Sequence, residues 1–464
     1  MMASTGKYQI DMCHGPLLSK IVLVALPLMA ANVMQVLFNA VDILVIGRYA
    51  DKTALAAVGS CVILITTILS FFLGLSVGAT VLVARGIGSR DRGATARSVH
   101  TAIALALYGG ILLAVVCIAV AKPMLKLMET PAEVLPKALL YMWLSALGIP
   151  LILLFTFGNS IMSATGDTRR PLVYMVVAGV VKVALNLLLV RSFALDVVGA
   201  ASATLVSNAL SAFLILRALT GVRGGTRLYW KFVRIYRPNL TEMLKIGVPA
   251  GIQGSVFGIS NVIIQSTINS FGTDTMAGNT AAVSIETTVY VASSAFYSTV
   301  MSFVGQNHGA KEYKRIVKSI WHCLWLSMAS SALVGWAAYF SGPYLLPVYN
   351  ADPNVVHHGL IRLNYVVTTY FIAAAMDITG GALRGLGHSL TPMLVSVGGI
   401  CVFRIFWVFC VLPFRRDMGM LLVSYPISWV LVLAVNGSIL FFVCRRLFRD
   451  PEGGADLKSR RMVL

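Results

Sequence analysis

The chain has 464 residues, of which 58% are hydrophobic and 12% are charged, and its formal net charge is +19. A soluble protein carries about 25% charged residues, so this composition excludes an ordinary soluble domain and indicates a protein that crosses a membrane many times. The positive charge could indicate nucleic-acid binding, but most basic residues fall in the connections on one side of the predicted spans. That bias sets membrane orientation, so we expect both termini in the cytoplasm, anionic lipid nearby and no nucleic-acid partner.

Twelve apolar segments are long enough to cross a bilayer, which requires about 20 residues. They lie at 17–47, 55–84, 98–121, 133–160, 171–190, 195–216, 246–270, 277–305, 317–340, 359–382, 392–412 and 418–444. Residues 1–16 lack the basic segment and cleavage site of a signal peptide, so the first span is expected to be retained. Lys182 and Arg404 are assigned to spans, whereas Arg362 is counted with the connections opposite the cytoplasm.

The first span carries a polar stripe. Asn32, Gln35, Asn39 and Asp42 are spaced so that a helix places all four on one face. The three amides are typical either of helix–helix contacts or of a functional face. A carboxylate within a span costs about 3 kcal/mol or more unless it faces a polar interior, so Asp42 indicates ion carriage. Pro27 interrupts the hydrogen-bond ladder and is expected to bend this helix.

The sequence is duplicated. Its halves match at an offset of 221 or 222 residues across spans, connections and prolines. The matched pairs include Pro27 and Pro249, Asn39 and Asn261, Gly166 and Gly387, Pro171 and Pro392, and Lys182 and Arg404. Each half holds an even number of spans, six, so both enter from the same side and form parallel repeats, as in transporters that rock two lobes around a central site.

This repeat predicts the fold class: an all-helical membrane protein of twelve spans in two parallel six-helix repeats. The expected parts are a cytoplasmic N-terminal segment (1–16), an N-lobe (17–219), a basic cytoplasmic linker (220–240), a C-lobe (241–446) and a cytoplasmic tail (447–464). Within the linker, Tyr229 to Tyr236 is either a basic amphipathic segment on the membrane surface or part of a flexible tether.

Two patterns imitate catalytic or metal sites. Gly74 to Gly78 fits GxSxG, but it lies inside a span with no strand before it, so a small-residue helix contact is the better interpretation. His357 and His358 are adjacent and cannot share a helix face as a zinc pair does. The seven cysteines show no metal-ligand spacing. We therefore predict no enzyme, no metal site and no cofactor.

Several motifs together resemble the multidrug and toxic compound extrusion (MATE) family, in the branch of the DNA-damage-inducible F proteins. Besides the first span, they are LAAVG (55–59), GLSVGATVLVARGIG (74–88), SATGDTRRP (163–171), GAASATLVSN (199–208), FVGQNHGA (303–310) and ALRGLGHSLTP (382–392). The resemblance covers essentially all twelve spans, and the doubled loop motif, ATGDTRRPL (164–172) and RGLGHSLTPM (384–393), is its most specific part.

The resemblance implies two six-helix lobes, an internal cavity, and export of mostly cationic, amphipathic drugs in exchange for H⁺ or Na⁺. It also implies a cation-coupling site in the N-lobe, formed by Asp42, Asn159, Asn186 and Thr204, with Pro27 bending the first helix. Where relatives with a described cation site carry a second aspartate, this chain has Val190. A lone carboxylate holds a dehydrated Na⁺ less well and can protonate instead, which favours H⁺ coupling.

The C-half offers a possible second site at Glu286 and Asp377, which could alternatively form structural pairs with Lys182 or Arg404. Aromatic faces and methionines suit varied organic cations, although such residues at helical spacing also serve simple packing. The candidates for lining a cavity are Gln35, Asn39, Asn261, Tyr290, Tyr297, Met301, Tyr370 and Met376.

The sequence therefore predicts a drug exporter of the cell (inner) membrane that acts as a monomer on small organic molecules. A flippase for lipids or lipid-linked oligosaccharides is the main alternative, but the better-known flippases of the wider superfamily have fourteen spans and a more cationic cavity. A metabolite exporter, for instance of organic acids, keeps the same fold, and basic residues lining the cavity would favour it.

Overall fold

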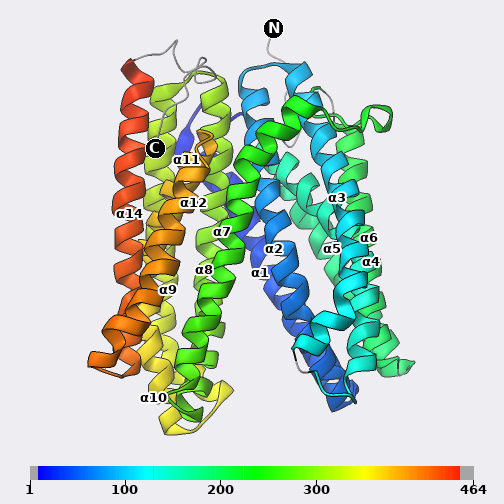
Figure 1. The fold of residues 1–464 in the computed structure, drawn as a ribbon. Coiled ribbons are helices and arrows are strands. Elements are labelled where there is room, and N and C mark those ends of the chain that lie inside the picture. Colours follow the sequence, from blue (N-terminus) through cyan, green and yellow to red (C-terminus); the bar gives the residue numbers. More distant parts are fainter. Residues whose placement is uncertain (1–8, 129, 194, 223, 450–464) are drawn as a thin grey trace. The chain divides into compact units, whose positions relative to one another are not determined.

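A computed structural model describes residues 9–128, 130–193, 195–222 and 224–449, and every regular element in those residues is helical (Figure 1). The all-helical prediction is confirmed. The described residues fall into two compact units. The first comprises the chain up to Asp11, then Leu23–Ile87 and Asp91–Ser255, and the second comprises Met12–Val22, Gly88–Arg90 and the chain from Val256. The two units do not coincide with the predicted lobes, because the first unit extends to Ser255 and the second includes Met12–Val22. The boundaries of the lobes stay a prediction.

The first half of the chain forms long helices joined by short turns. They are α1 (Leu17–Tyr49), α2 (Lys52–Gly88), α3 (Arg92–Leu127), α4 (Leu135–Ala164), α5 (Arg169–Asn186) and α6 (Asp196–Gly221). The π-helix η1 (Leu187–Ser192) extends α5, and the linker contains one 3₁₀ turn, η2 (Trp230–Phe232).

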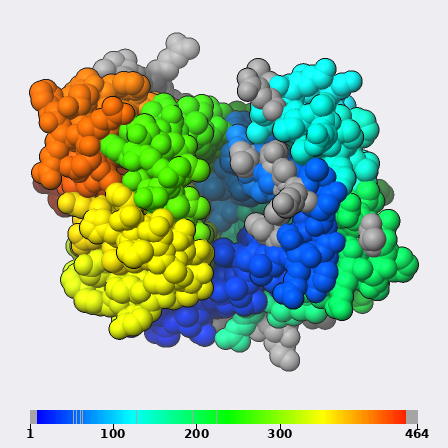
Figure 2. Space-filling view, turned by 90° about the horizontal axis from the view of Figure 1, so that it is seen from below, coloured from blue at the N-terminus to red at the C-terminus, as the bar shows by residue number. Residues whose placement is uncertain are grey.

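The second half repeats this order with more interruptions. Its elements are α7 (Arg237–Asn269), α8 (Thr273–Gly309), α9 (Tyr313–Tyr349), α10 (Pro353–Arg362), η3 (Leu363–Val367), α11 (Tyr370–Gly385), α12 (Leu390–Ser396), η4 (Val397–Val402), α13 (Phe403–Phe406), η5 (Trp407–Val411), η6 (Leu412–Phe414) and α14 (Met418–Arg449). Of these, η3, η4 and η5 are π-helical. Figure 2 shows the α7–α8 (green), α9–α10 (yellow) and α12–α14 (orange) connections gathered side by side at one end of the second unit.

Ten helices of the described chain are long and apolar enough to cross a membrane, and an eleventh span comes from a helix pair bent by 41° at Thr368–Thr369. The predicted segment 359–382 falls on this bent pair. The predicted segment 277–305 lies in α8, which has 37 residues but is not among the helices counted as spans. Its many Ser and Thr residues and Glu286 make it less apolar than the others. The chain is a multi-pass membrane protein.

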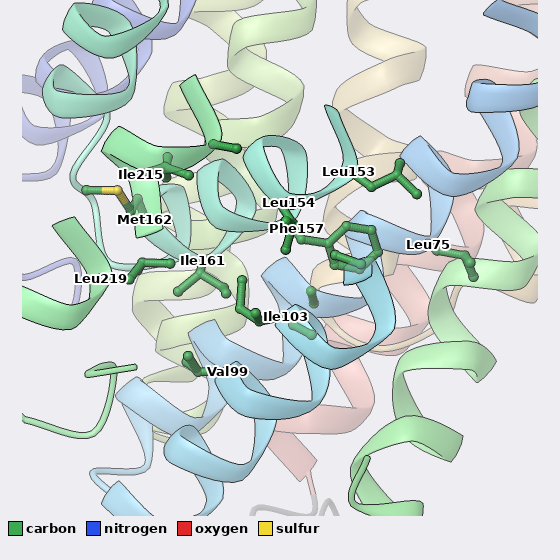
Figure 3. Packing of buried hydrophobic residues seen from close by; sticks show 14 of the residues in the cluster. Leu75, Val99, Ile103, Leu153, Leu154, Phe157, Ile161, Met162, Ile215 and Leu219 are labelled. Carbon is green, nitrogen blue, oxygen red and sulfur yellow. The ribbon is translucent and has the colours of Figure 1, made fainter. Parts of the chain in front are cut away.

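The main core of the first unit lies between α3, α4 and α6 (Figure 3). Phe157, Leu153 and Ile161 of α4 are fully buried against Ile103 of α3 and Ile215 of α6. Because lipid is as apolar as these side chains, close packing and small residues hold such helices together more than hydrophobicity does.

The GxSxG pattern of α2 is a site of close helix packing. A Cβ on Gly74 would lie 2.2 Å from the backbone nitrogen of Gly251, and one on Gly78 would lie 2.3 Å from the carbonyl oxygen of Met243. Both partners belong to α7. Interpreting this pattern as a small-residue helix contact is therefore confirmed.

Candidate functional site

Asp42 lies on α1 opposite two residues of α5. The Lys182 ammonium forms an ion pair with its carboxylate, and Asn186 Nδ2 donates a 3.0 Å hydrogen bond to Asp42 Oδ1. Lys182 and Asn186 are four residues apart, so a helix projects both toward the same place. The side chains of Asp42 and Lys182 are 19% and 13% exposed. The structure thus gives the intramembrane carboxylate a cation and an amide as partners.

The other predicted members of this site are less closely connected. Asn159 and Asn186 each have a buried side-chain oxygen with no hydrogen-bond donor in the described chain. No hydrogen bond to Asp42 from Asn159 or Thr204 is formed among these residues. Two unpaired amide oxygens in a membrane interior are costly, and they are suitable acceptors for a proton donor or a cation. Val190 is fully buried among apolar side chains.

Two other polar residues of the first span differ from Asp42 in burial. Gln35 and Asn39 are exposed, and so is Asn261, which matches Asn39 in the repeat. The helix α1 continues without interruption through Pro27.

The second unit contains a buried polar chain that begins at Glu286 of α8. Arg362 Nε and Nη2 donate to Glu286 Oε2 at 2.9 and 2.8 Å, and Arg362 Nη1 donates to Asn279 Oδ1 at 2.8 Å. Asn279 Nδ2 in turn donates to Gln265 Oε1 at 3.2 Å. Assigning Arg362 to a connection was wrong, because it is 5% exposed and lies within the helix pair. The predicted pairing of Glu286 with Lys182 or Arg404 was also wrong, since Glu286 pairs with Arg362.

Arg404, in α13, is 5% exposed and has no carboxylate within ion-pair distance in the described chain. Its guanidinium carbon lies 3.8 Å from the ring centre of Tyr425, and its Nε donates to Ser428 Oγ at 3.1 Å. The guanidinium of Arg362 lies 5.3 Å from the same ring. Two cations therefore share one aromatic ring, that of Tyr425 in α14.

Asp377, in α11, makes no hydrogen bond or ion pair with the rest of the described chain. Arg384 Nη1 donates to Tyr297 Oη.

Of the other predicted cavity residues, Met301, Tyr370 and Met376 are buried and Tyr290 is exposed. Tyr370 and Met376 pack in the apolar core of the second unit. Whether any of these residues lines a cavity stays a prediction.

The turns outside the spans carry their own charge pairs. Burial raises the pKa of Asp167, in the loop between α4 and α5, and the guanidinium of Arg170 beside it partly offsets that rise. At the start of α2, the hydrogen bond from Lys137 lowers the pKa of Asp51 to about 2. Neither turn contains a catalytic arrangement, and no three His, Cys, Asp or Glu side chains of the described chain gather as a metal site would require.

Comparison with known proteins agrees with the repeat. The profile of the MatE family matches twice, over residues 27–188 and 249–410, which are exactly 222 residues apart. The two matches together cover more than half of the chain. Because such transporters share a fold of twelve helices in two repeats, the predicted fold class is confirmed.

Individual relatives are similar over most of their length. The chain is 26% identical over 400 residues to "Probable multidrug resistance protein YpnP" of Bacillus subtilis, covering 85% of this chain and 88% of that protein. It is 25% identical over 398 residues to a "FAD transporter" of Shewanella oneidensis, covering 83% and 86%. A solved outward-facing structure of a multidrug resistance MATE family transporter superimposes with a TM-score of 0.89 at 19% identity, covering 96% and 99%.

Proposed function

Because the chain belongs to the MatE family of membrane transporters, and is therefore a transporter and not an enzyme, we propose that it exports small organic molecules by secondary active transport. The names of its relatives support drug export, and the substrates we propose are cationic, amphipathic molecules. The exchange is with H⁺ rather than Na⁺, since Val190 leaves Asp42 without a second carboxylate nearby. The protein acts as a monomer in the cell (inner) membrane with both termini cytoplasmic, and it belongs to the DNA-damage-inducible F branch.

The observation that supports this proposal most is the pairing of Asp42 with Lys182 and Asn186. Ionised Asp42 holds both partners and disfavours release of a cationic substrate. A proton arriving from outside neutralises the carboxylate, the ion pair with Lys182 is lost, and substrate affinity falls as the two lobes rock. Because both ligands act through one carboxylate, H⁺ and substrate each weaken the other's binding by the same factor. The proposed acceptors of the new O–H are the side-chain oxygens of Asn186 and Asn159, which have no hydrogen-bond donor in the described chain.

The test is movement of rhodamine 6G, an organic cation, in proteoliposomes under a pH gradient or a Na⁺ gradient imposed separately. We expect H⁺-driven movement that is lost in Asp42→Asn. Asp274→Asn, the same change at an exposed carboxylate, is the matched control and should transport normally. Movement driven by Na⁺ alone would refute H⁺ coupling, and H⁺-driven movement that survives in Asp42→Asn would refute the role of Asp42.

A metabolite exporter is the second candidate. Two observations favour it over a lipid flippase: one relative is named a FAD transporter, and three arginines are buried in the second unit. Uptake of labelled organic acids in the same proteoliposomes, with no movement of rhodamine 6G, would favour this alternative.

A further inference from the structure

Lys182 and Arg404 occupy matching positions of the two repeats but have different partners. The internal repeat pairs Lys182 with Arg404 at an offset of 222 residues, the same offset that separates the bounds of the two profile matches. By the same offset, Asp42 corresponds to Ile264, which is buried, and Asn186 corresponds to Val408. The second unit therefore has a cation at the equivalent position but lacks both groups that hold it in the first.

Arg404 is left with weak partners. A guanidinium has five N–H donors, and in the described chain only one of them has a hydrogen-bond acceptor, the hydroxyl of Ser428. The ring of Tyr425 attracts the positive charge, but a ring face accepts none of the directional hydrogen bonds that the remaining donors can make. A cation this deeply buried normally has a paired anion.

No carboxylate of the described second unit lies within ion-pair distance of Arg404. Glu286 already accepts two hydrogen bonds from Arg362. Asp377 forms no ion pair in the described chain, and Arg384 is a third buried arginine. The described interior of the second unit therefore holds three arginines against two acids, a surplus of one positive charge.

The backbone around Arg404 is also unusual. The π-helical segments η4 and η5 flank the short α13 that carries it. The same relation holds at Arg362, which precedes η3, and at Asn186, which precedes η1. Widened turns of this kind are rare and occur frequently at functional sites. In the first unit they accompany the Asp42 pair, and in the second they accompany the two arginines.

We propose that the second unit binds the anionic group of a small organic molecule at Arg404, with that group taking the place that Asp42 occupies beside Lys182. The planar guanidinium suits a carboxylate or a phosphate, which it holds through two parallel N–H donors. This site goes beyond the export of organic cations and does not depend on proton coupling at Asp42.

Two dyes of the same xanthene framework but opposite charge test the proposal. Fluorescein, an anion, and rhodamine 6G, a cation, are titrated against the full-length protein in nanodiscs of phosphatidylcholine, and fluorescence anisotropy gives each Kd. We expect fluorescein to bind, and Arg404→Gln to weaken it about tenfold or more, because hydrogen bonds to a charged partner are lost. Arg404→Lys should retain part of the affinity, and rhodamine 6G binding should not weaken in either variant.

Asp42→Asn separates this site from the proposed function, since it should abolish transport but leave fluorescein binding unchanged. Each variant is first checked for a thermal unfolding midpoint close to the parent's, and Arg404→Lys replaces Arg404→Gln if the latter unfolds. Equal fluorescein affinity in the parent and the folded variant would overturn the proposal. So would displacement of fluorescein by phosphatidylglycerol in the nanodisc, because the site would then hold a lipid headgroup.

Discussion

At the scale of single residues, the two units bury their carboxylates in different ways. Asp42 is held by a lysine and one amide, whereas both Nε and Nη2 of Arg362 donate to Glu286. Lysine is a compact charge on a flexible stem, while arginine has a rigid fork that fixes its partner. We therefore interpret the first pair as the one that opens during transport and the second as a structural clamp.

This difference predicts the effect of Glu286→Gln. Removing the charge leaves Arg362 buried and unpaired, and breaking a buried pair from one side typically costs about 3–5 kcal/mol. Thermal unfolding in detergent should show a lower midpoint, whereas Glu133→Gln, at an exposed position, should leave it unchanged. An unchanged midpoint combined with lost transport would instead identify Glu286 as a functional cation site.

The sequence could indicate Asp42, because an acid within an apolar span is visible without any structure. The family resemblance also assigned Asn186 to the site of Asp42, but the sequence did not indicate the ion pairs. Arg362 was assigned to a connection because it lies near the end of a span. At such a position the sequence looks the same whether the side chain faces water or a buried acid. Glu286 and Arg362 are 76 positions apart, and that spacing does not predict their contact.

At the scale of elements, the doubled loop motif has the same backbone in both repeats. Gly166 and Gly387 both adopt left-handed conformations, with φ of +81° and +86°. In the first loop, the hydroxyl of Thr168 donates a 3.0 Å hydrogen bond to the carbonyl of Val24, close to Pro27 of α1. The loop thereby ties the beginning of α5 to the part of α1 where a proline interrupts the ladder.

Gly166→Ala should destabilise the first unit. An alanine pays about 1–2 kcal/mol in the left-handed region, and its Cβ would lie 2.9 Å from the Ile10 side chain and carbonyl oxygen. Thermal unfolding measures the loss, and Gly258→Ala in α7 is the control because nothing lies within 4 Å of its added Cβ. If both variants unfold at the parent's midpoint, the loop does not support the unit in this way.

The duplicated loops and the helices were predictable because glycine, proline and apolar runs carry their own conformational preferences. The π-helical segments were not. A π turn needs one more residue than an α turn, and residues 397–411 show the same apolar composition as an ordinary span. The bend at Thr368–Thr369 could not be predicted either, because no proline or glycine lies there.

At the scale of the whole molecule, duplication is what sets the chemistry of each half. The repeat was readable from the sequence alone, and so was the equivalence of Lys182 and Arg404. The sequence did not show which of these two cations forms an ion pair with a carboxylate of the protein. The structure answers this with an ion pair in the first unit and an arginine on an aromatic ring in the second. One scaffold thus carries a self-neutralised site and a site with surplus charge.

If Ile264 is equivalent to Asp42, an acid introduced at Ile264 should pair with Arg404 as Asp42 pairs with Lys182. In Ile264→Asp, a carboxylate enters the second unit at the position that Asp42 occupies in the first, where it should pair with Arg404 and compensate its charge. We expect fluorescein binding to fall about tenfold or more, because the internal anion now competes for the guanidinium. Ile264→Asn, which adds a side chain of the same shape without charge, should bind fluorescein like the parent. Equal losses in both variants would show that bulk or polarity, and not charge, governs the site. Normal binding in folded Ile264→Asp would mean that Arg404 does not face the position given by the repeat, and the surplus charge would then have no role in binding.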